Sequence, residues 1–248
     1  MESAPSATWN PRRPLVRGIL RRLSIWAFAL LTDLRIVGRE NIPREGPLLV
    51  VANHFNFADP VLMLRVVPWR LEFLGGAQMP FAPRWVTWIP KLWGFFPVHR
   101  GTASRDALRA AEAVLQKRGV LGMFPEGGSW ATVLRPPRPG AAYLAVRTGA
   151  RILPMGFDGV HEVFRQLRQG RRARITVRIG QVFGPFEASG RGEERRRQLD
   201  AIGHEIMQRI AALIPPERRG YYSDDPSIRE AAKGIEVYPW DNGSLARP

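Results

Sequence analysis

Two side chains suited to proton transfer, His54 and Asp59, are separated by four residues directly after the apolar run at residues 48–52. A neutral imidazole is the usual base that takes the proton from an attacking hydroxyl near pH 7. A carboxylate on the other ring nitrogen fixes the tautomer and stabilises the imidazolium that forms. The pair predicts His54 as a general base oriented by Asp59, while Asp59 is also suited to be the N-cap of a following helix.

A second polar pair, Glu126 and Gly127, follows another apolar run at residues 120–124. Short apolar runs bounded by glycine, proline or polar residues are typical of strands that are buried on both faces. In parallel sheets, functional residues collect at the carboxyl ends of the strands. We therefore expect both polar pairs to lie at the same edge of a sheet.

The order of the expected elements predicts one α/β domain, with a central, mostly parallel sheet that is covered by helices on both faces. Strands are expected at residues 34–37, 48–52, 70–74, 120–124, 151–157 and 173–179, and helices from residue 59 and at residues 104–117, 140–148 and 193–213. The domain is expected to span residues 34–220, between a disordered start at residues 1–14 and a tail at residues 221–248.

Residues 15–33 place arginines before a group of apolar residues that includes Trp26. This pattern predicts an amphipathic helix, which either lies in a membrane interface or packs on the domain. The stretch from Met79 to Phe96 is rich in aromatic residues and has only Arg84 and Lys91 as charged residues. It too suits either a membrane interface and a wall for acyl chains or the packing of a core.

The chain has 248 residues with 37 lysines and arginines, 22 aspartates and glutamates and no cysteine, and its formal net charge is +15. The absence of cysteine excludes disulfides, thiolate metal sites and a cysteine acyl-enzyme. The positive charge reflects either a bias of composition or a surface that attracts anions. No spacing of histidines and carboxylates resembles a zinc or calcium site, so no metal is expected.

Four blocks in order resemble the His-x4-Asp acyltransferases, the family of lysophosphatidic acid acyltransferases and their relatives. They are Asn53-His54-Phe55-Asn56-Phe57-Ala58-Asp59, Gly94-Phe95-Phe96-Pro97-Val98-His99-Arg100, Phe124-Pro125-Glu126-Gly127-Gly128 and Ile152-Leu153-Pro154. The resemblance implies the glycerol-3-phosphate acyltransferase-like fold and direct transfer of an acyl group from a thioester to a hydroxyl, without a covalent acyl-enzyme. The donor would be acyl-coenzyme A or an acyl carrier protein as cosubstrate, with no bound cofactor.

By the same resemblance, His54 is the base, Asp59 orients it, and Gly94, Arg100, Glu126 and Gly127 bind the acceptor. His99, which adjoins Arg100, is a secondary candidate for the base. The resemblance further implies a lipid acceptor, an anionic membrane surface as a partner, and a peripheral or monotopic location at the cytoplasmic face of the inner or plasma membrane.

Two departures from the family pattern concern the acceptor. Gly128-Ser129-Trp130 lacks the arginine that often follows the third block, and Ala77-Gln78 stands where a lysine is common. Arg100, and Arg135 or Arg138 in the loop after the third block, remain as cations for a phosphate. We therefore consider acceptors other than lysophosphatidic acid, such as another lysophospholipid, a glycolipid or a polyol.

Three other functions compete with acyl transfer. A lipid-binding protein of the same fold would lack catalysis, which the His54–Asp59 pair argues against. A hydrolase would use water in place of the acceptor hydroxyl. A nucleic-acid-binding protein would explain the charge, but its basic residues should cluster on one face among aromatic residues, and here the arginines are scattered, so no nucleic acid is expected as a partner.

Overall fold

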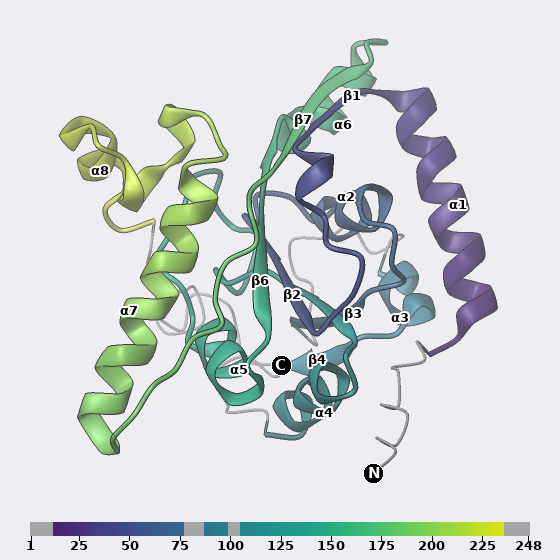
Figure 1. Ribbon diagram of the computed structural model, residues 1–248. Helices are drawn as coiled ribbons and strands as arrows, with labels where there is room; N and C mark the ends of the chain where they lie inside the picture. The colour runs from purple at the N-terminus through teal and green to yellow at the C-terminus, as the bar shows by residue number, and fades with distance from the viewer. Residues whose placement is uncertain (1–11, 77–86, 99–104, 236–248) are drawn as a thin grey trace.

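The computed structural model describes residues 12–76, 87–98 and 105–235, so predictions for the other residues, among them Arg100, His99 and the disordered start as far as residue 11, lie outside the described residues. Residues 12–14 of the predicted disordered start are ordered, since Arg12 donates to Glu72 and Pro14 begins the first helix. A seven-stranded sheet with the order β1-β7-β6-β2-β5-β3-β4 forms the centre of the protein (Figure 1). The strands are β1 (Thr32–Val37), β2 (Leu48–Ala52), β3 (Glu72–Gly76), β4 (Phe96–Val98), β5 (Val120–Met123), β6 (Arg151–Asp158) and β7 (Ala173–Ile179).

Most neighbouring strands run parallel, as the sequence predicts. β2 pairs in parallel with both β5 and β6, β3 pairs in parallel with β5 and β4, and β1 pairs in parallel with β7. Among the described strands, only the β6–β7 pair is antiparallel. The carboxyl ends of β5, β2 and β6 therefore lie side by side at one edge, with β2 in the middle.

Helices cover both faces of the sheet, which confirms the α/β expectation (Figure 1). The described helices are α1 (Pro14–Leu31), α2 (Asp59–Val66), α3 (Trp88–Trp93), α4 (Arg105–Gln116), α5 (Gly140–Thr148), α6 (Val163–Arg168), α7 (Gly192–Ala211) and α8 (Pro226–Ala232), with short 3-10 helices at Arg39–Asn41, Val160–Glu162, Pro216–Arg218 and Gly220–Tyr222. Residues of α1, α2, α3 and α6 share one hydrophobic cluster, and those of α4, α5 and α7 share the other.

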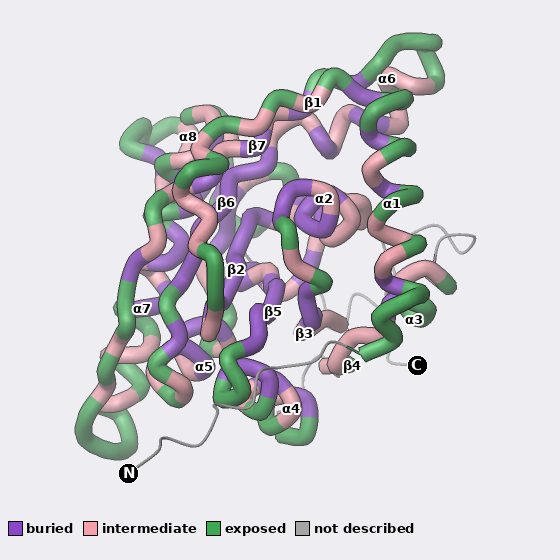
Figure 2. Tube along the Cα trace, turned by 45° about the vertical axis from the view of Figure 1, so that its right-hand side comes forward, coloured by how far each residue is buried: buried purple, intermediate pink, exposed green. Residues whose placement is uncertain are grey.

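The central strand β2 shows why an unbroken apolar run predicts a strand here. Leu48, Val50 and Ala52 belong to the first cluster, whereas Leu49 and Val51 belong to the second. Because side chains alternate between the faces of a sheet, a strand covered on both sides must be apolar at every position. Figure 2 shows β2, β5 and β6 as buried segments at the centre. Because β2 is buried along its whole length, the polar residues that follow it begin at the edge of the sheet.

The amphipathic helix α1 is present and ends at Leu31, two residues before the predicted end, because Thr32 and Asp33 already belong to β1. Arg17, which is fully buried, anchors it: its guanidinium donates to both carboxylate oxygens of Glu72 on β3, at 2.7 and 2.8 Å. Although burial raises the pKa of the Glu72 carboxyl, the hydrogen bonds and charges of Arg17 and Arg12 hold that pKa below its usual value. No described helix is long and apolar enough to cross a membrane.

Candidate active site

His54 is held at the end of β2 by its neighbour Asn53. The fully buried Asn53 side chain donates to the carbonyl of Phe157 at 2.9 Å and accepts from the N–H of Phe157 at 2.7 Å. Phe157 is on β6, so the amide continues the pairing of β2 with β6 beyond the last paired residues. A buried amide bonded at both ends is a rigid link, and it fixes the direction in which the chain leaves the sheet toward His54.

The ring of His54 contacts Asp59 as the sequence predicts. Nδ1 of His54 lies 3.0 Å from Oδ2 of Asp59, and the same oxygen accepts the backbone N–H groups of Phe55 and Asn56, both at 2.8 Å. Asp59 is 1% exposed. An ionised carboxylate only accepts hydrogen bonds, so it selects the tautomer with the proton on Nδ1 and leaves the lone pair on Nε2.

The prediction that Asp59 is the N-cap of the next helix is wrong. Ala58 occupies the N-cap position of α2, and Asp59 is the first residue of the helix. Its carboxylate points back to the preceding loop, where the backbone N–H groups of Phe55 and Asn56 converge on it. Asp59 therefore closes the loop around His54 instead of capping α2.

One face of the His54 ring is covered by an aromatic side chain, and the side chain of His54 is partly exposed. Phe124 stacks on the ring, with centroids 4.2 Å apart and an angle of 22° between the planes. The His54 side chain is 15% exposed, and among the described residues Nε2 has no hydrogen-bond partner. The ring is thus held on one nitrogen and one face, with its other nitrogen available to a substrate.

Glu126 lies beside His54 because β5 and β2 are neighbours. Its Oε1 accepts the backbone N–H of His54 at 2.7 Å, and its Oε2 accepts from Nε of Arg135 at 3.0 Å. Both side chains are buried, at 1% and 2% exposure. Burial raises the pKa of the Glu126 carboxyl, and the charge of Arg135 opposes that rise. The structure thus gives Glu126 a positioning contact to His54 that the sequence did not indicate.

Arg135 is not an exposed cation in the loop after β5, as the sequence analysis considered it. Besides Glu126 it binds the carbonyl oxygen of Gly128, and its guanidinium lies 3.7 Å from the ring centroid of Trp130. These contacts use its charge inside the protein. The pairing of Arg135 with Glu126 spans nine residues of irregular chain, and no local pattern in the sequence indicates it.

Gly127 allows the turn that places Glu126. Its φ is +80°, in the region that glycine alone enters without strain, and its N–H donates to the carbonyl of Phe124 at 3.0 Å. Gly94 also has a positive φ, +78°, and its carbonyl accepts from Arg17 at 3.0 Å. Gly94 precedes β4, at the amino end of that strand, whereas His54 and Glu126 follow the carboxyl ends of theirs. The predicted role of Gly94 in acceptor binding stays a prediction.

Three comparisons relate the chain to known proteins. A model of the family described as Acyltransferase matches residues 33–158, a range that contains His54, Asp59, Glu126 and Gly127. The 1-acyl-sn-glycerol-3-phosphate acyltransferase of Borreliella burgdorferi is 24% identical over 149 residues, which are 58% of this chain and 57% of that protein. This chain therefore aligns with little more than half the length of that curated relative.

The third comparison concerns the fold. The crystal structure of the 1-acyl-sn-glycerophosphate acyltransferase from Thermotoga maritima is similar with a TM-score of 0.53 and 25% sequence identity, over 78% of this chain and 79% of that one. The likeness therefore extends beyond the residues that the family model matches.

Proposed function

The chain belongs to the acyltransferase family, and from this premise we propose that it transfers a fatty acyl group from a thioester to a hydroxyl of a lysophospholipid of the 1-acylglycerol-3-phosphate type. The observation that carries this proposal is the His54–Asp59 contact with Nε2 of His54 open to a substrate. Both relatives described above have names of this acceptor type.

In the proposed reaction, Nε2 of His54 takes the proton from the acceptor hydroxyl while the hydroxyl oxygen attacks the thioester carbonyl. The resulting tetrahedral intermediate collapses, the carbon–sulfur bond breaks, and the imidazolium returns the proton to the leaving thiolate. Asp59 stabilises the imidazolium between these steps. A cysteine acyl-enzyme is excluded because the chain has no cysteine.

The donor we propose is acyl-coenzyme A or an acyl carrier protein. Both are anionic, and a chain with a formal net charge of +15 attracts either one. The thioester itself supplies the activated acyl group, so the proposed reaction needs no metal and no bound cofactor.

The test is an assay of the purified full chain with a set of acyl-coenzyme A donors and an acceptor set of lysophosphatidic acid, other lysophospholipids and monoacylglycerol. We expect a new ester, identified by mass spectrometry, together with an equal amount of free coenzyme A. Release of coenzyme A without an ester would contradict the proposal in favour of a hydrolase. Absence of both the ester and the free thiol with every donor, an acyl carrier protein included, would favour a lipid-binding protein without catalysis.

We propose further that the protein binds peripherally to the cytoplasmic face of the inner or plasma membrane through α1 and α3. Figure 2 shows exposed residues that recur along α1. The large apolar side chains among them include Leu15, Ile19, Leu23, Trp26 and Leu30, exposed by 82, 59, 58, 75 and 75%, and α3 adds Trp88 at 53% and Leu92 at 42%. Exposed Arg13, Arg22 and Lys91 accompany them. Such a surface suits the headgroup boundary of an anionic bilayer.

Replacing Leu23 and Trp26 together with serine should weaken vesicle binding by roughly 10²- to 10⁴-fold, since each large apolar side chain contributes about 1.5–3 kcal/mol on burial. Flotation with vesicles of phosphatidylcholine and phosphatidylglycerol measures this. Tyr221→Ser is the matched control, because Tyr221 is 45% exposed but lies beyond α7, away from α1. Equal loss in both variants, or none in either, would contradict a role of α1 in docking.

A further inference from the structure

A C-terminal segment, residues 214–222, joins the loops that follow β5 and β6. The N–H of Leu134 donates to the carbonyl of Arg218 at 2.9 Å, and the Arg218 guanidinium donates to the carbonyl of Thr132 at 3.4 Å. The other guanidinium nitrogen lies 2.8 Å from Nε2 of His161, just after β6. Because β2 lies between β5 and β6, Arg218 contacts the loops on both sides of the strand from which His54 leaves the sheet.

Two observations place the loop after β6 beside the His54 loop. Phe57 stacks on Phe164 of α6, with ring centroids 5.0 Å apart. The charge of Asp59 also acts on the ring of His161. Burial and the charge of Arg218 lower the pKa of His161, so the ring is neutral near pH 7 and its Nε2 accepts the hydrogen bond from Arg218. This bond gives the guanidinium a defined direction.

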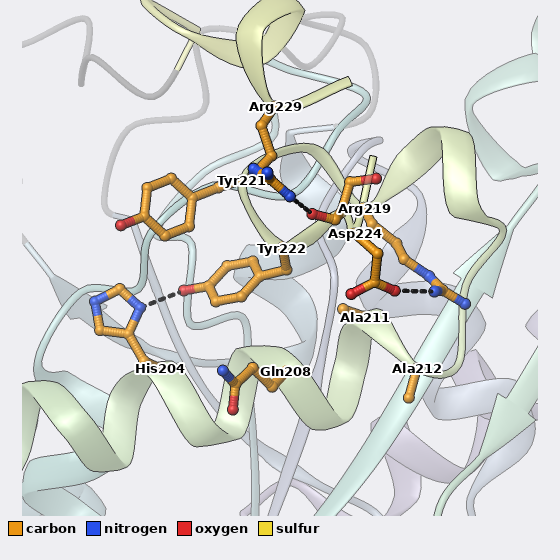
Figure 3. Close-up of a pocket in the computed structure, with 10 residues that line it drawn as sticks. His204, Gln208, Ala211, Ala212, Arg219, Tyr221, Tyr222, Asp224 and Arg229 are labelled. Atoms are coloured by element: carbon orange, nitrogen blue, oxygen red, sulfur yellow. Dashed lines mark hydrogen bonds and ion pairs between the residues drawn. The ribbon is translucent and has the colours of Figure 1, made fainter. Parts of the chain in front are cut away.

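The segment is anchored directly after Arg218. A Cβ at Gly220 would lie 2.4 Å from the carbonyl oxygen of Leu134, so the two backbones are in direct contact. Figure 3 shows the Tyr222 hydroxyl bound to Nδ1 of His204 on α7, at 2.8 Å. The neighbouring Arg219 faces Asp224 at 3.7 Å. The Gly220 and Tyr222 contacts therefore fix the backbone that presents Arg218, whereas the Arg219–Asp224 pair, in which Asp224 is fully exposed, contributes little.

The partners of Arg218 differ from those of Arg17, Arg135 and Arg219. Arg17 and Arg135 each bind a buried glutamate, and Arg219 faces Asp224. Within residues 12–76, 87–98 and 105–235, no carboxylate lies within ion-pair distance of Arg218, whose printed partners are the neutral Thr132 carbonyl and His161 ring. Its guanidinium is thus paired with no carboxylate among these residues, although Glu162 lies near, with Oε1 3.8 Å from Nε2 of His161.

We propose that Arg218 binds the phosphate of the acceptor lipid and so determines selectivity for a phosphate-bearing acceptor. This inference rests on the proposed function. A guanidinium donates in a planar fork that matches phosphate oxygens, and two of its nitrogens are already oriented by Thr132 and His161. Arg218 would supply the cation that the chain lacks after Gly128, where the sequence has Ser129 and Trp130.

The experiment compares wild type with Arg218→Gln, Arg218→Lys and the matched control Arg219→Gln, using steady-state kinetics with lysophosphatidic acid and one acyl-coenzyme A. For Arg218→Gln we expect the acceptor KM to rise on the order of 10- to 100-fold, as for loss of a charged hydrogen bond. The donor KM should stay within about twofold, since no donor contact is lost in this proposal. Arg218→Lys should recover part of the loss, and Arg219→Gln should resemble wild type.

A second readout does not depend on turnover: glycerol 3-phosphate should raise the melting temperature of wild type and of Arg219→Gln, but not of Arg218→Gln, while glycerol at equal concentration should not. A fall in kcat with an unchanged acceptor KM, or a rise in the donor KM alone, would overturn the proposal, in favour of loop bracing or binding of donor phosphates. If wild type acylates no acceptor, the proposed function fails, and the thermal shift alone then tests whether Arg218 binds a phosphate. Absence of a shift in wild type then overturns the phosphate site as well.

Discussion

Replacing His54 with alanine should lower the rate of acyl transfer by roughly 10²–10⁴-fold, the contribution typical of a positioned general base. The reason is geometric: Nδ1 is bound to Asp59, so Nε2 is the one ring nitrogen left to accept the hydroxyl proton. The fold should persist, because Asp59 keeps the backbone N–H groups of Phe55 and Asn56. The measurement is kcat and KM for the ester product, beside the melting temperature of each variant.

The matched control for this prediction is His204→Ala. His204 is a partly buried histidine that also makes one side-chain hydrogen bond, to Tyr222, but it lies on α7. Its loss should leave kcat nearly unchanged. If His54→Ala keeps wild-type turnover while remaining folded, His54 is not the base, and His99, the secondary candidate from the sequence, would be tested next.

All described strands except the three-residue β4, which was not predicted, and the polar pairs after β2 and β5 could be predicted from the sequence because their signals are local. The five residues of β2 are all apolar, and this pattern predicts a buried strand. The helix α5 was predicted with its observed bounds. Once the strands are known, the parallel arrangement brings the ends of β2 and β5 to one edge. His54 and Glu126 were therefore expected at the same edge, and the pairing of β2 with β5 in the structure brings them into contact.

The partners of the charged side chains could not be predicted, because those contacts depend on packing between distant segments. Arg17 meets Glu72 across 55 residues, and Arg218 meets His161 across 57. Both arginines stand in sequences rich in other arginines, so neither differs from its neighbours in any local pattern. The same reason explains the misplaced N-cap: the direction of the Asp59 carboxylate is decided by the loop that folds over it.

The charge of the chain also acquires a more specific meaning from the structure. The sequence left open whether the excess of arginine reflects composition or an anion-binding surface. Arg17 and Arg135 are buried and neutralise Glu72 and Glu126, so these two cations hold the fold at the α1–β3 contact and at the His54 loop. Other arginines, such as Arg13 and Arg22, are exposed.

Replacing Arg135 with leucine should destabilise the protein by about 3–5 kcal/mol, the cost typical of leaving one partner of a buried ion pair without the other. The carboxylate left without its partner is that of Glu126, which is 1% exposed and accepts the backbone N–H of His54. Turnover should fall with stability, because the position of His54 depends on that bond. Chemical denaturation measures the first effect and the acyl-transfer assay the second.

The pH dependence and a second substitution separate this cause from simple loss of packing. Burial already raises the pKa of Glu126 and the charge of Arg135 opposes it, so Arg135→Leu should raise that pKa further. A carboxyl with a raised folded-state pKa binds its proton more tightly in the folded state, so stability falls as pH rises through that pKa. The variant should therefore lose more stability at pH 8 than at pH 5.

Adding Glu126→Gln, which keeps an acceptor for the His54 N–H, should restore much of the stability and remove this added pH dependence. Arg109→Leu, in an exposed pair with Asp106, is the control for losing an arginine and should change little. A double variant no more stable than Arg135→Leu alone would show that the packing of Arg135 on Trp130, and not the stranded charge, is what the loop requires.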